Sequence, residues 1–584
     1  MVSSTRFAVV LLPTLVVLLL PGCRDDIDTV REIQAERQSR MQSQTQQDHL
    51  GEAFSLLSRL VELNPDKAQR QITYHLNRWR EDKSFESAPV TEMIRTVSEV
   101  LPADEATQRT ARENYLPSDV NHLRDSYLFR RIVEWVDREQ GDDPLLADWL
   151  TSMDKELSED EAQQLRTATR LFDWTIRNIA FEPLVPLDGA PNPPALPLGM
   201  KFRGAGIRQT DYQTVWRGTG DSLQRAGVFT NLCRQSSIPA FILAIQSIET
   251  GQLDPWCVGV LIGKQVYLFD PEVGSFIPGP NQVGIATLSQ ARSDASVLRR
   301  LNVPGFFDYP LTKQDVQQCI ALLNVLPEAI SPRMKNLESG LTGDRRMKVF
   351  VDADALAKRI DEVPGIAGVR LWKVPLLAEV YAQAVAKAAE RDPLLAFWYF
   401  SRWAILESQL ANAEKLALGR WRHLHGQFDT DEEEDTEGAR VIYLAQRAPE
   451  YEIEDLRIDV DLQQAYGVRR ELGIDAETYN RQLQQAQMMM RLGKRTATYW
   501  ISLIQYDDGR YETAESWFTK RVLNEEQLSF WEPHARYNLA RTLERSGDTD
   551  RAIELYKTDG DPQEHGNRLR ARLLAKWVDE QPGE

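Results

Sequence analysis

The chain has 584 residues, of which 42% are hydrophobic and 27% are charged, a balance typical of soluble globular proteins. At about 150 residues per domain, this length favours several folding units. The formal net charge of −18 disfavours nucleic acid and anionic lipid headgroups as partners, because both carry negative phosphates.

Residues 1–22 have the pattern of an export signal. One basic residue, Arg6, precedes an apolar stretch from Phe7 to Leu20, and the stretch runs into the letters LPGC. This ending resembles the lipobox of bacterial lipoproteins, which implies a diacylglycerol on Cys23 and an anchor without a spanning helix. Pro21 departs from the small residue usual there, so plain secretion and an uncleaved anchor are alternatives. We expect an exported protein of the cell envelope, membrane-anchored on the periplasmic or outer side.

Two regions without a chemical motif follow the signal. Residues 23–50 are polar and charged, which predicts a tether or an exposed helix. Residues 51–157 carry apolar side chains at helical spacing, as in the stretch YLFRRIVEWVD. This spacing predicts a helical N-terminal region.

Residues 158–285 combine helices with three apolar runs of strand length. Ser158 predicts the cap of a first helix with Glu161 in its first turn, and Asp221 and Ser222 can cap a second. The runs AFILAIQSI, WCVGVLIG and QVYLFDPEVG follow, separated by turns that contain glycine. Helices followed by antiparallel strands are an α+β arrangement, so we expect a multidomain α+β protein.

Residues 286–375 predict a small α/β unit without a chemical motif. We expect a helix in LTKQDVQQCIALLNVLP, a strand in MKVFVDA, a helix in DALAKRIDEV and a strand in GVRLWKVP.

Residues 376–584 are helical in pattern and carry a repeat. Three positions recur at one offset of 38 residues, so that Gly509, Ala514 and Phe518 return as Gly547, Ala552 and Tyr556. The pattern resembles tetratricopeptide repeats, in which a small residue lies at a close helix crossing and an aromatic packs into the next helix. The resemblance implies a concave surface suited to a peptide or a partner's helix, and a generic helical bundle is the alternative.

Two further stretches of this region could suggest ligands. A third candidate hairpin, with Gly426 and Phe428, runs into the acidic insertion DTDEEEDTEG, in which Glu434 stands where a calcium loop of the EF-hand type needs glycine. We therefore interpret the insertion as a solvated loop. The aromatic-rich stretch DPLLAFWYFSRWAILE predicts helix packing in the core rather than a ligand groove.

The segment from about 158 to 280, about a fifth of the chain, resembles the transglutaminase-like superfamily, a papain-related fold with a Cys, His and Asp triad. RLFDWTIRNI matches the helix before the core, RAGVFTNLCRQSSIPAFILAI matches the nucleophile helix and first strand, and YLFDP matches the end of the strand that bears the acid. The family's cysteine lies five residues before the core aromatic, here Phe229, so Gln224 occupies its place. The histidine position falls at Trp256, and only Asp270 matches.

No other nucleophile replaces the missing cysteine. The attacking species in this chemistry is a thiolate, which glutamine cannot supply. Cys233 lies nine residues further along the helix, about 13 Å up the axis and about 180° round, so we expect a buried thiol. None of the seven histidines lies between residues 123 and 422, so a cysteine or Ser222 would need a base from a distant part of the chain. At most one disulfide is possible in the body, and Cys233 with Cys257 is the pair closest in sequence.

These vacancies predict a degenerate module in a non-catalytic exported protein. We expect it to bind a protein or peptide partner through the repeat surface and the former substrate cleft, with no cofactor and no metal. The alternatives are a cysteine-type acyltransferase or peptidase with an unconventional site, a hydrolase that uses carboxylates, and a structural cell-envelope protein. The sequence contains no HExxH, CxxC, GxxxxGK[ST] or GxSxG motif.

Overall fold

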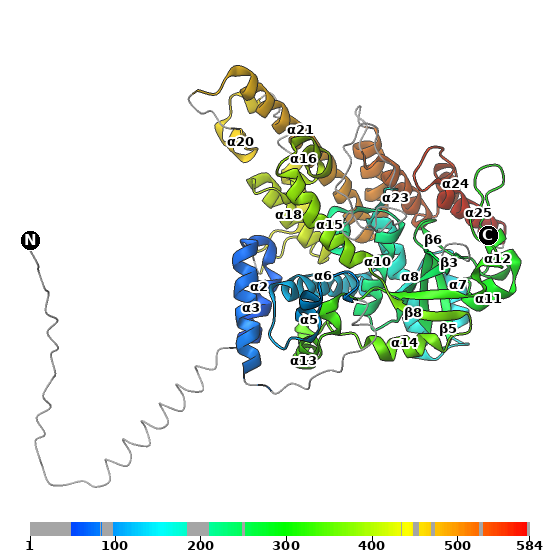
Figure 1. Ribbon diagram of the computed structural model, residues 1–584. Coiled ribbons are helices and arrows are strands. Elements are labelled where there is room, and N and C mark those ends of the chain that lie inside the picture. The colour runs from blue at the N-terminus through cyan, green and yellow to red at the C-terminus, as the bar shows by residue number, and fades with distance from the viewer. Residues whose placement is uncertain are drawn as a thin grey trace, which may run out of the picture.

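A computed structural model gives the three-dimensional structure of the chain (Figure 1). It describes residues 48–81, 83, 97–183, 209–247, 251–433, 435–447, 455–468, 473–524 and 530–580. The predicted export signal, Cys23 and most of the predicted tether lie outside the described residues. Within these ranges, no helix combines the length and the hydrophobicity needed to cross a bilayer.

The N-terminal region is helical, as the apolar spacing predicts. Along α6, Leu128, Ile132 and Val136 recur every four residues and are completely buried, the one-sided pattern of a helix packed on a core. The elements of this region are α2 (His49–Ser58), η1 (Leu60–Glu62), α3 (Pro65–Glu81), α5 (Ala103–Ala111), α6 (Pro117–Glu139) and α7 (Ala147–Met153).

A mixed sheet of six strands forms the centre of the α+β fold, in the order β6-β5-β4-β3-β7-β8. All neighbours are antiparallel except β7 and β8, which are parallel. The three strands predicted from the apolar runs are therefore confirmed as β3, β4 and β5. The strands are β3 (Ala240–Gln246), β4 (Leu253–Ile262), β5 (Gln265–Asp270), β6 (Ser275–Phe276), β7 (Cys319–Leu323) and β8 (Ile366–Leu371).

Two capped helices, α8 (Glu159–Asn178) and α10 (Ser222–Gln235), lie against this sheet (Figure 1). Ser158 caps α8 in a reciprocal box with Glu161, as predicted. Asp221 alone caps α10: its Oδ1 accepts from the Gln224 amide at 2.9 Å, and Ser222 is the first helical residue. Helix α9 (Asp211–Arg217) and strand β2 (Thr219–Gly220) directly precede α10 in the chain, and β2 pairs in parallel with β1 (Ala180–Phe181), which follows α8.

Three phenylalanines join these helices to the sheet. Phe172 of α8, Phe229 of α10 and Phe269 of β5 are buried, and their ring centroids lie 5.0–5.3 Å apart. Such tilted aromatic contacts contribute about 0.5–1.5 kcal/mol each beyond the area they bury. Phe229 is thus the core aromatic of α10, as predicted.

Residues 286–375 differ from the predicted separate unit. The stretch expected as a helix contains β7, whose five residues are all buried and which pairs with both β3 and β8. So short an apolar run has no periodicity that separates a strand from a buried helix, and the open edge of β3 decides the outcome. MKVFVDA forms no strand, whereas α14 and β8 are confirmed. The helical elements of this segment are η3 (Pro280–Gln282), α11 (Leu288–Ser293), α12 (Ala295–Arg299), η4 (Asp315–Gln317), η5 (Pro327–Ile330), α13 (Pro332–Gly340), η6 (Gly343–Arg345) and α14 (Ala353–Asp361).

After β8, the described residues form helices, as predicted. In the aromatic-rich stretch, Trp403 is buried but the Phe397 side chain is 52% exposed, so the prediction of core packing is right only in part. The elements are α15 (Val374–Ala389), α16 (Pro393–Phe400), η7 (Ser401–Trp403), α17 (Ala404–Glu407), α18 (Ala411–Leu424), α19 (Ala439–Arg447), η9 (Asp455–Arg457), α20 (Val460–Ala465), α21 (Ala476–Asp507), α22 (Tyr511–Trp517), the π-helix η10 (Phe518–Leu523), α23 (Glu532–Arg545), α24 (Thr549–Tyr556) and α25 (Glu564–Glu580).

Glycines end three of these helices in the same way. Gly426, Gly509 and Gly547 follow α18, α21 and α23 with φ of +70°, +72° and +80°, the left-handed conformation that glycine adopts without steric cost. In each case the glycine amide donates to the carbonyl three residues before it.

The other repeat positions also correspond. Ala514 and Ala552 lie completely buried in α22 and α24, the helices that return after Gly509 and Gly547. Phe518 and Tyr556 follow four residues later and are buried too. The 38-residue offset therefore places equivalent residues at equivalent points of two successive helix hairpins.

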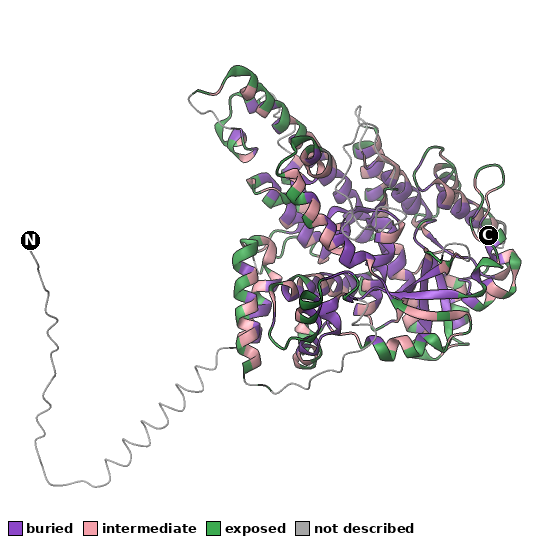
Figure 2. Cartoon of the chain, in the orientation of Figure 1, coloured by how far each residue is buried: buried purple, intermediate pink, exposed green. Residues whose placement is uncertain are grey.

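One continuous hydrophobic cluster runs from the N-terminal helices through the sheet into these hairpins. Figure 2 shows the buried residues as an unbroken interior, whereas α20 and the adjoining part of α21 project from the body with a small cluster of their own. The predicted boundaries near residues 157, 285 and 375 are therefore not breaks in the packing.

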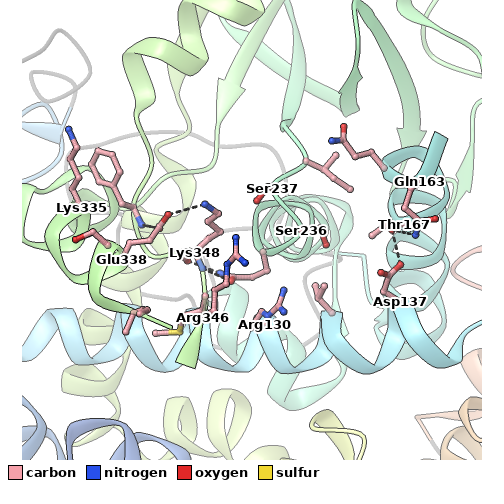
Figure 3. A pocket seen from close by; sticks show the side chains of 18 residues that line it. Arg130, Asp137, Gln163, Thr167, Ser236, Ser237, Lys335, Glu338, Arg346 and Lys348 are labelled. Carbon is pink, nitrogen blue, oxygen red and sulfur yellow. Dashed lines mark hydrogen bonds and ion pairs between the residues drawn. The ribbon is translucent and has the colours of Figure 1, made fainter. Parts of the chain in front are cut away.

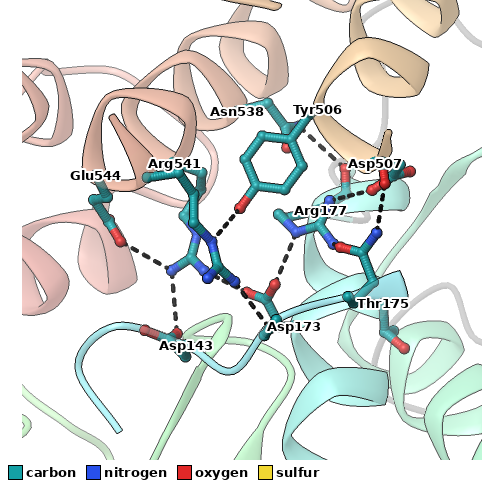
Figure 4. A network of polar contacts seen from close by, with 12 residues as sticks. Asp143, Asp173, Thr175, Arg177, Tyr506, Asp507, Asn538, Arg541 and Glu544 are labelled. Carbon is teal, nitrogen blue, oxygen red and sulfur yellow. Dashed lines mark hydrogen bonds and ion pairs between the residues drawn. The ribbon is translucent and has the colours of Figure 1, made fainter. Parts of the chain in front are cut away.

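A buried network of ion pairs links α8 to the C-terminal hairpins (Figure 4). Arg177 of α8 pairs with Asp173 at 2.8 Å and with Asp507 of α21 at 2.6 Å. Arg541 of α23 pairs with Asp173 at 2.7 Å and with Asp143 at 3.2 Å. Glu544, at 3.3 Å from Arg541, and Arg570, which pairs with Asp143 and Glu544, belong to the same network. Both the Arg177 and Arg541 side chains are completely buried, so their charges are compensated by protein groups rather than by solvent.

Replacement of Arg541 by alanine should strongly destabilise the fold. The change leaves Asp143 and Asp173 buried with one fewer cation, so we expect urea denaturation to give a free energy of unfolding lower by about 3–5 kcal/mol.

Arg551→Ala is the matched control, because Arg551 of α24 is 56% exposed and forms surface ion pairs with Glu515 and Asp548. It should change the same free energy by less than about 1 kcal/mol. Equal effects of the two substitutions would contradict a structural role for the buried network.

Candidate functional site

Gln224 lies buried in the first turn of α10, where the resemblance to the transglutaminase-like superfamily predicts a nucleophile. Its Oε1 accepts from the Asp221 amide at 3.0 Å and from Gln209 Nε2 at 3.2 Å. The side-chain amide thus closes the helix cap from one side and bonds to a buried glutamine from the other. It contributes hydrogen bonds and no nucleophilic atom.

Trp256 and Asp270 are brought together by a third residue, Tyr309. Trp256 Nε1 on β4 donates to the Tyr309 hydroxyl at 2.6 Å. That hydroxyl in turn donates to Asp270 Oδ2 at the end of β5, also at 2.6 Å. The result is a directed chain of hydrogen bonds that ends on a carboxylate, with indole and phenol groups where a proton-transferring imidazole would be needed.

Asp270 also holds the turn that follows β5. Its Oδ1 accepts from the amides of Glu272 and Val273 at 2.9 and 3.2 Å, the pattern by which an aspartate side chain stabilises a turn. Burial raises the pKa of Asp270 to about 6, although the Tyr309 hydroxyl and the two amides favour the carboxylate. The carboxyl therefore titrates in the range where proteins function.

Sequence reasoning missed Arg225, the neighbour of Gln224 in α10. Its guanidinium is completely buried and donates to the carbonyls of Ile179, at 2.7 Å, and Pro271, at 3.3 Å. It also lies over the Phe181 ring. Arg225 thus ties the start of α10 to β1 and to the turn after Asp270, and no motif in the sequence marks this role.

All three cysteines of the described chain are free and buried. Burial raises the pKa of the Cys233, Cys257 and Cys319 thiols, which opposes formation of the reactive thiolate. The possible Cys233–Cys257 disulfide does not form, and Cys233 is the buried thiol that its position on α10 predicts.

One histidine does reach this region from a distant part of the chain. The ring of His565, on α25, stacks on Phe307 at 5.0 Å and lies 6.3 Å from the Tyr309 ring. Its Nε2 is 2.7 Å from the Leu301 carbonyl, an acceptor, so Nε2 carries the proton and donates. No cysteine sulfur hydrogen-bonds to a histidine within the described part of the chain.

An open cleft of about 630 Å³ lies at the opposite end of α10 (Figure 3). Its walls come from α6, α8, the turn after α10, α13 and residues 346–350. Polar side chains include Gln163, Thr167 and Ser237, and apolar ones include Met347 and Phe350. This size and mixed lining lie within the range of ligand clefts, about 300–1,000 Å³.

The charge available in this cleft is positive. The two carboxylates of its lining already have cationic partners: Asp137 lies 3.7 Å from Arg170 and also accepts from Thr167 Oγ1, and Glu338 pairs with Lys348 at 3.0 Å. Arg346 is exposed and forms no ion pair with any described residue. Figure 3 shows its guanidinium near the middle of the cleft, beside that of Arg130.

Metal-ligating groups do not gather in the described chain: no cluster of three or more His, Cys, Asp or Glu side chains there could hold an ion. Comparison with protein-family models, curated proteins and solved structures gives no match. A functional proposal for this chain therefore rests on its own geometry.

The raised pKa of Asp270 predicts a pH dependence of stability. Between about pH 4, the pKa of an unfolded aspartate, and pH 6, the folded chain binds this proton more tightly, so its contribution to stability falls as pH rises. Asp270→Asn cannot ionise. Denaturation at pH 4 and pH 7 should show the variant gaining about 2–3 kcal/mol relative to the unmodified chain.

Asp361→Asn, at the exposed end of α14, is the control and should leave the pH profile unchanged. Parallel profiles for Asp270→Asn and the unmodified chain would show that Asp270 is not held in a raised-pKa state.

Proposed function

We propose that the chain is a non-catalytic binding protein of the cell envelope that holds an acidic peptide segment of a partner protein in the open cleft. In this proposal residues 158–285 are a transglutaminase-like module without its nucleophile and base, the C-terminal hairpins are tetratricopeptide-like, and Cys23 carries the lipid anchor. The observation that carries the proposal is the exposed Arg346 in the middle of a large open cleft, where it has no ion-pair partner among the residues that the structure describes.

The environment of Gln224 supports the absence of catalysis. Its side chain is buried and bonded to Asp221 and Gln209, and the Trp256–Tyr309–Asp270 chain contains no imidazole. A thiol enzyme needs an accessible thiolate with a nearby base, and here burial raises the pKa of each described thiol.

The cleft lining supports an acidic peptide as the ligand. Arg346 and Lys335 offer cations, whereas Arg130 is already paired with Glu134 at 2.8 Å. A planar guanidinium such as that of Arg346 binds a carboxylate through two parallel hydrogen bonds. The side chains of Gln163, Gln164 and Ser237 can pair with peptide amides and carbonyls along the walls. The positive side chains in the cleft also attract acidic partners locally, although the chain as a whole is strongly acidic.

In this proposal the C-terminal hairpins have a structural role and do not bind the partner. Their inner side chains are engaged with the chain's own core: Asn538 Nδ2 donates to the Arg177 carbonyl at 3.1 Å, and Arg541 pairs with Asp173. We therefore assign them the role of bracing the module that carries the cleft, and we place the partner in the cleft.

Fluorescence anisotropy with short labelled peptides tests the cleft. We expect an Asp- and Glu-rich hexapeptide to bind at least tenfold more tightly than the matched Asn and Gln peptide, with affinity falling as salt rises. Arg346→Glu should weaken binding of the acidic peptide by about 10- to 100-fold, the range expected for one charge-assisted contact.

Arg345→Glu is the matched control, because Arg345 is the adjacent residue but pairs with Asp48 and does not line the cleft. It should leave peptide affinity unchanged. Equal affinity for acidic and neutral peptides, or equal loss in both variants, would refute the cleft as the binding site.

A further inference from the structure

A second, inner cavity of about 110 Å³ lies between α6, α9, α10 and the segment after β7. Arg109, Arg124 and Arg234 line it together with Asp125, Asp211, Glu328 and Glu379. Positive and negative side chains are therefore nearly balanced around a small, partly open space. Such a lining favours neither a simple anion nor a simple cation.

Arg234 and Asp211 carry opposite charges in this wall but do not pair with each other. Asn231 lies between them: its Oδ1 accepts from Arg234 at 2.8 Å, and its Nδ2 donates to Asp211 Oδ2 at 2.7 Å. Asn324 repeats the arrangement, because its Nδ2 donates to Asp211 at 3.0 Å while its carbonyl accepts from Arg234. Neither Arg234 nor Asp211 forms an ion pair with any residue that the structure describes.

This separation is costly for the protein alone. Asp211 and Arg234 are both partly buried, and a charge that leaves water without a directly paired counter-charge is unfavourable. Burial raises the pKa of Asp211 to about 6 and lowers that of Arg234 to about 10, the directions expected for incompletely compensated charges. A ligand that carries both charges at a fixed spacing would compensate both at once.

The other charges of the cavity are already paired. Arg109 bonds to Glu328 at 2.7 Å and to Glu379 at 2.9 Å. Arg124 donates twice to Asp125 Oδ1, at 2.9 and 2.7 Å, and lies over the Tyr212 ring. Asp211 and Arg234 are thus the two groups in this wall whose charge is left for a ligand.

We propose that the inner cavity binds a small zwitterionic α-amino acid, with its carboxylate toward Arg234 and its ammonium group toward Asp211. The size sets the identity: a cavity of about 150 Å³ holds the six heavy atoms of benzene, so about 110 Å³ suits the five of glycine or the six of alanine. Leucine and larger amino acids do not fit. The site is separate from the open cleft, with which it shares Gln235 as a wall residue.

Titration calorimetry of the full chain at pH 7 tests this assignment with ligands of nearly equal size. We expect glycine and alanine to bind at one site per chain. Glycolate, in which a hydroxyl replaces the ammonium group, and glycinamide, in which an amide replaces the carboxylate, should each bind at least tenfold more weakly. Leucine should not bind. The proposal would be overturned if glycine and alanine gave no heat at about 10 mM, or if glycolate or glycinamide bound as tightly as glycine.

Variants assign each charge to its wall residue. Asp211→Asn should weaken glycine at least tenfold but leave glycolate unchanged, since glycolate has no ammonium group to lose. Arg234→Gln should weaken glycine and leave glycinamide unchanged. A variant that is only destabilised would lose affinity for all ligands alike. If a variant does not fold, the ligand series on the unmodified chain still tests the proposal.

Arg346→Gln, in the open cleft, is the control and should leave glycine binding unchanged. This control also separates the two proposals, because loss of acidic-peptide binding with intact glycine binding concerns the cleft alone. Equal loss of glycine and glycolate in a folded Asp211→Asn chain would contradict the assignment of the ammonium group.

Discussion

The buried ion pairs of Arg177 and Arg541 are the interaction on which the rest of the structure depends. They hold the C-terminal hairpins against α8, and Phe172 on the same helix holds α10 against the sheet. Helix α8 is thus fixed by charge pairing toward the hairpins and by aromatic packing toward the core. Because each arginine is buried and pairs with carboxylates from more than one segment, the N-terminal helices, the sheet and the hairpins stabilise one another.

Within that body, the two ends of α10 have different roles. The N-terminal end serves the fold: Asp221 and Gln224 close the helix cap, and Arg225 binds the turn after Asp270. The C-terminal end reaches both proposed binding sites, since Arg234 lines the inner cavity and Ser237, just beyond the helix, lines the open cleft. We therefore propose a helix that packs as a nucleophile helix would but serves binding at its other end.

Helix caps and helix ends were predictable from the sequence because they depend on neighbouring residues. The features that were not predictable depend on contacts between residues far apart in the chain. Ser158 and Asp221 cap their helices by hydrogen bonds to residues three positions later. Gly509 and Gly547 end their helices in a left-handed conformation that other residues rarely adopt, so the glycines themselves indicate the helix ends. In contrast, β7 is a strand because β3 offers it an edge, and Tyr309 reaches Asp270 across 39 positions. Asn324 meets Asp211 across 113 positions, so no local pattern could reveal the inner cavity.

The central proposal is that residues 158–285 form a transglutaminase-like module without the chemistry of a thiol enzyme, and an activity assay tests it most directly. The chain from Arg24 onward and its variant with Cys233, Cys257 and Cys319 changed to Ala would be assayed for amine incorporation into, and hydrolysis of, glutamine-containing and general peptides. The account predicts no turnover above the uncatalysed rate for either protein. Turnover that disappears in the triple variant would contradict it by revealing an active thiol, and turnover in both would contradict it by revealing a different catalytic group.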